Sequence, residues 1–317
     1  MLEFIVFLVA LFVTYIVTPI FIKKLTRAGI TGTDIHKPNK PKIPEMGGLA
    51  ILFGFSAGVL FSIVFISSDL VGISAVLISV LLLGLIGVCD DLFGIRQKTK
   101  IILPVFAAIP LMVIQAGVHT MTIPFIGIVN FGIIYPLFLI PLGITVVSNS
   151  FNMLAGYNGM EVGSGFIACA LIAIIGIITG NSTVAILMFS MSGACLAFLK
   201  YNKYPSRIFP GDVGTFSIGA AFAGAVIIGN MEGIAAIIIL PHIINGFITI
   251  MEILRGKTIQ KFSEVKNGIL VPPKKDNLNT LYFLLERRFR LTEKKLVYMI
   301  WLLTLIFGLI AFAILNL

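Results

Sequence analysis

The chain has 317 residues, of which 58% are hydrophobic and only 12% are charged, and its mean hydropathy is +1.07. This composition excludes an ordinary soluble domain and indicates an integral membrane protein. The formal net charge of +9 comes from 23 Lys and Arg against 14 Asp and Glu. Because these basic residues lie in loops beside apolar segments, where lipid headgroups meet them, we expect no nucleic-acid partner.

About ten apolar segments are long enough to cross a membrane. A helix needs roughly 20 residues to span the hydrocarbon core. The predicted spans lie near residues 3–22, 46–67, 71–89, 101–118, 133–149, 162–179, 183–199, 213–230, 234–254 and 296–316. They predict an all-α, polytopic membrane protein that forms one domain over residues 1–317.

All the basic residues can be placed on one side of these spans. Positively charged loops stay in the cytoplasm during membrane insertion, so we predict that this face, and any active site on it, is cytoplasmic. The cytoplasmic loops are then about 23–45, 90–100, 150–161, 200–212 and 255–295. An even number of spans puts both termini on the opposite side. The apolar and basic tail at 278–295 is expected to lie flat on the inner leaflet.

The third span ends in two adjacent carboxylates, Asp90 and Asp91. At a helix C-terminus they oppose the helix dipole as well as each other. Such a pair is tolerable beside a cation. Lys98 and Lys100 follow within a few residues, and Mg²⁺ is the commonest partner where phosphates are handled. A solvated helix end is the alternative interpretation.

Two further polar groups are expected on the same face of the membrane. Asn149 and Asn152 lie three residues apart at the end of the fifth span and share one side of a helix. Asp212 begins the eighth span in a Phe-Pro-Gly-Asp-Val-Gly turn, where capping is the alternative role. Carboxylate and amide oxygens suit a hard cation, although Asn also forms hydrogen bonds between membrane helices. Together these groups predict phosphoryl chemistry at a membrane surface.

Four motifs resemble the polyprenyl-phosphate N-acetylhexosamine-1-phosphate transferase family (MraY- and WecA-like enzymes). They lie at residues 39–45, 90–100, 149–161 and 204–212, in the order of the family and each at the expected end of a span. Their Ile-Pro-Glu and Tyr-Pro-Ser-Arg forms are most similar to the eukaryotic and archaeal branch that makes dolichyl-diphosphate GlcNAc. The resemblance runs from the first span to about residue 250.

The resemblance implies a reaction and a set of site residues. GlcNAc-1-phosphate would pass from UDP-GlcNAc to a polyprenyl (dolichyl-type) phosphate and release UMP, with Mg²⁺, or Mn²⁺ in its place, as cofactor. The implied residues are Asp90, Asp91, Lys100 and Asp212 for catalysis, Glu45, Asn149, Asn158 and Lys100 for substrate, and Asn152 and Asp212 for the metal. Direct attack is favoured over a covalent aspartyl intermediate, because a phosphate monoester is mostly dianionic at neutral pH.

The last cytoplasmic loop departs from the family pattern, as does Gly94, where relatives often carry Asn or Asp. The loop has neither the His cluster of bacterial members nor the Arg-rich stretch of the eukaryotic enzyme. Its basic residues are candidates for holding the sugar or the phosphates: Arg255, Lys257, Lys266, Lys274 and Lys275. The prediction of GlcNAc therefore depends on the resemblance alone, and N-acetylmuramoyl-pentapeptide or another N-acetylhexosamine is the closest alternative. The missing histidines argue against the muramoyl form.

Two other classes of protein also fit the hydrophobic pattern. A transporter or flippase for a lipid- or nucleotide-linked sugar would place ionisable groups near the membrane midplane, where only His242 and Glu252 lie. A non-catalytic scaffold would not need the clustered carboxylates and amides. The expected setting is an archaeal plasma membrane, or the endoplasmic reticulum in a eukaryote. Membrane lipids are expected partners, and a second copy of the chain, as a homodimer, is a further candidate.

Overall fold

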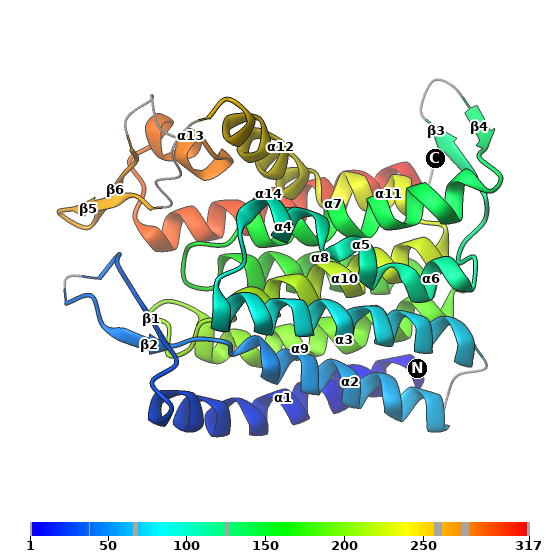
Figure 1. Cartoon of the computed structure of the whole chain (residues 1–317), viewed down its shortest axis with the longest axis horizontal. Coiled ribbons are helices and arrows are strands. Elements are labelled where there is room, and N and C mark those ends of the chain that lie inside the picture. Colours follow the sequence, from blue (N-terminus) through cyan, green and yellow to red (C-terminus); the bar gives the residue numbers. More distant parts are fainter. Residues whose placement is uncertain are drawn as a thin grey trace.

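The computed structural model describes residues 2–37, 39–65, 69–123, 127–256, 262–273 and 279–315. Long helices lie side by side along a common direction and form a bundle (Figure 1). Within the described residues, eight helical segments are long and apolar enough to cross a membrane singly. They are α1 (Leu2–Arg27), α2 (Gly48–Phe65), α3 (Leu70–Phe93), η1 with α7 (Tyr135–Leu139 and Ile140–Met153), α8 (Met160–Ile178), α9 (Ser182–Asn202), α10 (Gly211–Gly229) and α14 (Glu293–Leu315). The predicted class, a polytopic helical membrane protein, is confirmed.

A further pair of helices forms one bent segment. α11 (Glu232–Ile238) and α12 (Leu240–Leu254) meet at an angle of 76°. Pro241 lies in the first turn of α12, where its missing N–H group and its ring prevent a continuous helix through the junction. If the pair is one span, the described residues supply up to nine spans.

The predicted span over residues 101–118 is interrupted and is not one continuous helix. This stretch forms three short helices, α4 (Gln97–Ile102), α5 (Pro104–Ala107) and α6 (Ile109–Val113). Pro104 and Pro110 interrupt it, because each removes a backbone donor and crowds the preceding turn. The expected count of ten spans is therefore not confirmed.

In the described part of the chain, three short antiparallel strand pairs, which the apolar pattern did not predict, lie at the ends of the bundle (Figure 1). The pair β3 (Thr120–Ile123) and β4 (Gly127–Asn130) lies at one end with both chain termini. The other end, called the loop-rich end below, carries β1 (Thr31–Thr33) with β2 (Lys42–Pro44), β5 (Glu264–Lys266) with β6 (Ile269–Val271), and α13 (Leu281–Arg288).

α13 packs into the protein as well as bordering its surface. It contacts α12 and α14, and its Tyr282, Phe283 and Glu286 are buried. Leu284, on another face, is 44% exposed. The tail that the sequence placed flat on the membrane therefore has one face inside the molecule.

α10 lies in the centre of the bundle, and 83% of its apolar stretch is buried. It packs against α3 at Gly87, where a Cβ atom would overlap the backbone of Val213. The missing side chain lets the two helices approach closely. This contact brings the end of α3, with Asp90 and Asp91, to the start of α10, with Asp212.

Replacing Gly87 by Ala is therefore expected to destabilise the protein by about 1–3 kcal/mol, the usual cost of overpacking. The added methyl group has to push α3 away from α10. Thermal unfolding in detergent measures this loss of stability. Gly233→Ala is the matched control, because nothing lies within 4 Å of a Cβ at that position. Equal unfolding temperatures for the two variants would contradict the prediction.

Candidate active site

A cavity of about 550 Å³ lies at the loop-rich end. Its wall is built by segments that are far apart in the sequence: the β1–β2 region, the end of α7 with the loop at 154–159, the start of α10, and the approach to α13. Six of the predicted site residues line it: Glu45, Asp91, Lys100, Asn152, Asn158 and Asp212. The other two, Asp90 and Asn149, are buried behind the wall.

Asp212 is the centre of a polar cluster in this wall. Its Oδ2 atom accepts a hydrogen bond from the ammonium group of Lys100, and its Oδ1 atom accepts one from the amide of Asn152. The same amide donates to Thr215 Oγ1 at 2.8 Å. Lys100 Nζ also pairs with Asp90 Oδ2 at 2.6 Å. Lys100 therefore bridges carboxylates from two different helices, α3 and α10.

Lys100 is buried, yet it keeps its charge. Burial alone lowers the pKa of Lys100, but the charges and hydrogen bonds of Asp212 and Asp90 outweigh this effect and raise the pKa above its ordinary value. The ammonium group therefore stays protonated at neutral pH. A buried positive charge of this kind is poorly screened, so it interacts strongly with an anion that enters the cavity.

Asp91 holds the start of α10. Its Oδ1 atom accepts a hydrogen bond from the backbone N–H of Asp212 at 2.8 Å, and its Oδ2 atom accepts one from Val213 at 3.3 Å. The first N–H groups of a helix have no partner within the helix, so Asp91 caps α10 from α3. Gly211 leaves room for this carboxylate, because a Cβ there would overlap it. Asp91 thus fixes the position of Asp212.

Asp90 and Asn149 support the wall from behind. Asp90 is buried and pairs with Lys100. The amide of Asn149 donates to the carbonyl oxygen of Ile101 at 3.2 Å, which joins α7 to the end of α4. Both residues thus help to place the segment that carries Lys100. Direct contact of either with substrate stays a prediction.

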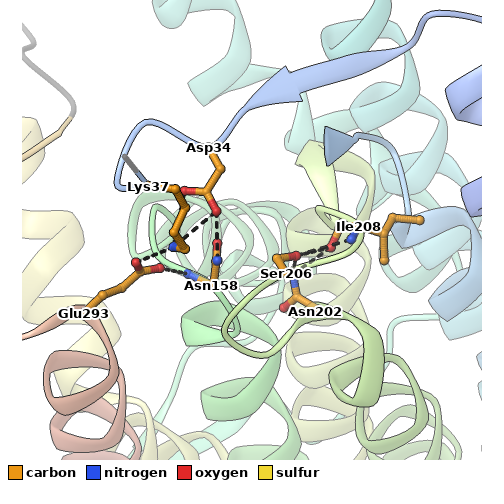
Figure 2. Close-up of polar contacts among 7 residues, drawn as sticks. All are labelled: Asp34, Lys37, Asn158, Asn202, Ser206, Ile208 and Glu293. Atoms are coloured by element: carbon orange, nitrogen blue, oxygen red, sulfur yellow. Dashed lines mark hydrogen bonds and ion pairs between the residues drawn. The ribbon is translucent and has the colours of Figure 1, made fainter. Parts of the chain in front are cut away.

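The loop before Asp212 is shaped by its own polar side chains (Figure 2). Asn202 Nδ2 and Ser206 Oγ both donate to the carbonyl oxygen of Ile208, at 3.0 and 2.8 Å. The residue that follows, Phe209, lines the cavity. The Tyr-Pro-Ser-Arg motif therefore has a structural reason for its Ser, which folds the turn that leads to Asp212.

Four aromatic residues of the cavity wall were not predicted from the sequence. His36, Tyr157, Phe262 and Tyr282 all line the cavity, and the rings of His36 and Tyr157 stack with their centroids 4.6 Å apart. Burial lowers the pKa of His36 to about 4, so its imidazole is neutral at pH 7. These four residues come from separate segments without common spacing, and only the fold brings them together.

The basic candidates in the last loop are only partly described. Lys257, Lys274 and Lys275 lie outside the described residues. Arg255 pairs with Glu252 at 3.2 Å, with its own side chain 64% exposed, and Lys266 pairs with Glu264 at 3.3 Å on the surface. Neither Arg255 nor Lys266 is part of the cavity wall.

The described part of the cavity wall is acidic. It contains five carboxylates and, as its single Lys or Arg, Lys100; the acids are Asp34, Glu45, Asp91, Glu161 and Asp212. Such a wall repels a multiply charged anion unless a cation accompanies it. In the described ranges, no three His, Cys, Asp or Glu side chains surround a common metal position. A cation here would therefore need amide, hydroxyl, water or ligand oxygens as well, as is usual for Mg²⁺.

Comparison with known proteins gives a family for this arrangement. The sequence profile of the glycosyl transferase family 4 matches residues 73–230, which include Asp90, Asp91, Lys100, Asn152 and Asp212. A Saccharolobus solfataricus protein, provisionally named UDP-N-acetylglucosamine–dolichyl-phosphate N-acetylglucosaminephosphotransferase, is 37% identical over 308 residues. The match covers 96% of this chain and 94% of that protein.

Two more distant relatives carry related names. The Dictyostelium discoideum UDP-N-acetylglucosamine–dolichyl-phosphate N-acetylglucosaminephosphotransferase is 30% identical over 276 residues, covering 73% of this chain and 67% of its own length. The Halalkalibacterium halodurans phospho-N-acetylmuramoyl-pentapeptide-transferase is 31% identical over 274 residues. This match covers 79% of this chain and 83% of that protein. Each of these relatives is named as an enzyme that transfers a phosphate-linked amino sugar.

Proposed function

Because the chain belongs to the glycosyl transferase family 4, we propose that it transfers GlcNAc-1-phosphate from UDP-GlcNAc to a polyprenyl phosphate of the dolichyl type. An oxygen of the lipid phosphate attacks the phosphorus atom that carries GlcNAc. A new P–O–P linkage forms, the bond to the phosphate of UMP breaks, and UMP leaves. The product, polyprenyl-diphosphate-GlcNAc, starts the assembly of a lipid-linked glycan. The names of the Saccharolobus and Dictyostelium relatives support these substrates.

One observation carries the proposal: Lys100, Asn152 and Asp212 meet in one cavity wall. They come from α4, α7 and α10, and both Lys100 and Asn152 donate hydrogen bonds to Asp212. A cation, an amide and a carboxylate at one point can hold the groups of a diphosphate while its charge is redistributed. A scaffold protein has no need for such a buried polar cluster inside an apolar bundle.

We assign Lys100 to the diphosphate. Asp90 forms an ion pair with its ammonium group from behind the wall. Lys100 can therefore keep that partner while it turns its other N–H donors toward phosphate oxygens. The buried position strengthens this interaction because water screens it little. Lys100 thereby binds UDP-GlcNAc and offsets negative charge as the P–O bond breaks.

We assign no proton transfer to Asp90 or Asp91. The lipid phosphate is mostly dianionic at neutral pH, so it requires placement and charge neutralisation more than a base. Both carboxylates are also engaged already, Asp90 with Lys100 and Asp91 with two backbone N–H groups of α10. These contacts favour direct attack over an aspartyl intermediate.

We infer that Mg²⁺, or Mn²⁺ in its place, assists this reaction. Asp212 and Asn152 would hold it, since their carboxylate and amide oxygens, with the Thr215 hydroxyl nearby, form a donor set for a hard cation. The acidic cavity wall supports this inference. When bound, such a cation would neutralise charge on the diphosphate.

We further propose that the loop-rich end faces the cytoplasm, because the loops expected to carry all the basic residues lie at this end and positively charged loops stay inside. The host membrane is then an archaeal plasma membrane, or the endoplasmic reticulum in a eukaryote. The Halalkalibacterium relative makes N-acetylmuramoyl-pentapeptide the sugar to test against GlcNAc.

The test measures UMP release by the purified protein from a panel of nucleotide sugars with polyprenyl phosphate and Mg²⁺. Mass spectrometry of the lipid product identifies the sugar and counts the phosphates. UMP release and a lipid diphosphate from UDP-GlcNAc support the proposal. Transport of labelled nucleotide sugar into vesicles without UMP release would support a transporter instead. If a product forms only from the muramoyl substrate, the transferred sugar is N-acetylmuramoyl-pentapeptide and not GlcNAc, while the proposed reaction stays the same.

A further inference from the structure

Two neighbouring residues of the cavity wall, Tyr157 and Asn158, are held by the C-terminal part of the chain. They lie on the loop at 154–159, between α7 and α8 and outside both helices. Each residue is hydrogen-bonded to a buried glutamate, Tyr157 to Glu286 and Asn158 to Glu293. Glu286 lies on α13 and Glu293 begins α14, and both are outside the stretch that matches the family profile.

Glu293 closes a ring of polar contacts (Figure 2). Its Oε1 atom accepts a hydrogen bond from the backbone N–H of Asn158 at 3.1 Å, and its Oε2 atom pairs with Lys37 Nζ at 2.6 Å. Lys37 also pairs with Asp34 at 3.2 Å, and Asp34 accepts the side-chain amide of Asn158 at 3.0 Å. One carboxylate therefore ties the segment at 31–37, which contains β1, and the loop at 154–159 to the start of α14.

Glu286 makes a second connection of the same kind. Its Oε1 atom accepts a hydrogen bond from the Tyr157 hydroxyl at 2.7 Å, and its Oε2 atom accepts one from Ser263 Oγ. Ser263 follows Phe262, which lines the cavity. Tyr157 in turn stacks on His36. Glu286 therefore holds the segment at 262–263 and the loop at 154–159 together.

Ordinary packing does not account for this pattern. Burying a carboxylate is costly, and buried ion pairs are weak evidence for stability. Here each of two buried carboxylates joins two different loops, and each of these loops carries residues of the cavity wall. The shared consequence of the two connections is a fixed shape of the cavity.

We propose that Glu286 and Glu293 are positioning residues that hold the segments at 31–37, 154–159 and 262–263 around the nucleotide sugar. This inference rests on the proposed function, because it assumes that the cavity is the substrate site. The two glutamates touch no reacting atom. They act through Tyr157, Asn158 and Lys37, so their loss should weaken substrate binding more than it slows the chemical step.

The test compares Tyr157→Phe and Glu293→Gln with matched variants at the opposite end of the bundle. There Tyr135 donates to Glu232 in another tyrosine–glutamate pair, which is partly buried, where α11 contacts β3. Tyr157→Phe removes only the hydroxyl that reaches Glu286 and keeps the ring stacked on His36. Tyr135→Phe makes the same chemical change away from the cavity, and Glu232→Gln is the control for Glu293→Gln.

We expect both site variants to raise the KM for UDP-GlcNAc by about three- to tenfold, the effect of losing one hydrogen bond, with kcat little changed. The controls should leave the KM unchanged even where they lower the unfolding temperature. In a double-variant cycle, Tyr157→Phe should add little to Glu286→Leu, because Glu286→Leu already removes the acceptor of the Tyr157 hydroxyl. Unchanged KM values in folded site variants, or equal KM shifts in the controls, would overturn the inference. An inactive wild-type protein would refute the proposed function instead.

Discussion

Replacing Asp212 by Asn is expected to lower the rate of UMP release by about 10²–10³-fold, the loss seen when a preorganised charged or polar group is removed from an active site. The Asp212 carboxylate accepts hydrogen bonds from Lys100 and Asn152, and an amide can offer only one oxygen to these two donors. It also carries no charge to hold a cation. The rate is measured with saturating UDP-GlcNAc and polyprenyl phosphate.

The control for this variant is Asp69→Asn. Asp69 caps α3 near the opposite end of the bundle, where its Oδ1 atom accepts the backbone N–H of Gly72 at 2.9 Å. Because Asn also caps helices well, Asp69→Asn should retain activity. Binding of Mn²⁺, followed by electron paramagnetic resonance, gives a readout that does not depend on turnover, and Asp212→Asn should weaken it. Full activity of Asp212→Asn would remove the central residue from the proposed site.

Replacing Lys100 by Met is expected to reduce activity by about 10²-fold or more, since the variant loses the positive charge assigned to the diphosphate. The folded protein should also lose about 3 kcal/mol of stability, because Asp90 and Asp212 would then face each other without their shared partner. Lys100→Arg changes the shape of the cationic group but keeps its charge. Because that charge still pairs with the two carboxylates, Lys100→Arg should unfold near the wild-type temperature.

A double variant separates the two roles of Lys100. Adding Asp90→Asn to Lys100→Met removes the carboxylate that is left unpaired behind the wall, so thermal stability should recover in part. Activity should not recover, because the cavity still has no ammonium group. If the double variant regains both stability and turnover, Lys100 serves folding alone and the diphosphate needs another partner.

The sequence singled out polar residues at the ends of apolar spans as candidates for the site. Asp91, Lys100, Asn152 and Asp212 stand out because polar groups at the ends of apolar spans are unexpected, and the structure brings them to one cavity. What each does there was not predictable. Asp90 and Asp91 are adjacent in the chain but point in different directions on α3.

Asp91 therefore reaches the start of α10, whereas Asp90 reaches Lys100. The rotation of α3 against α10 decides between these roles, and the close packing at Gly87 sets that arrangement. Glu286 and Glu293 gave no signal in the sequence, because two acids in a basic tail look like solvated surface charges. Only the packing of α13 and α14 against the loop at 154–159 buries them.

The sequence by itself determined that the protein is an α-helical membrane protein and which of its ends is rich in basic residues. These are local properties, since a helix satisfies its own backbone in lipid and its length follows from the apolar run. The tertiary structure decided which carboxylate faces the cavity, where Pro104 and Pro110 break a span, and how separate loops form one wall. Those outcomes depend on contacts between residues that are distant in the chain, and such contacts have no periodic pattern in the sequence.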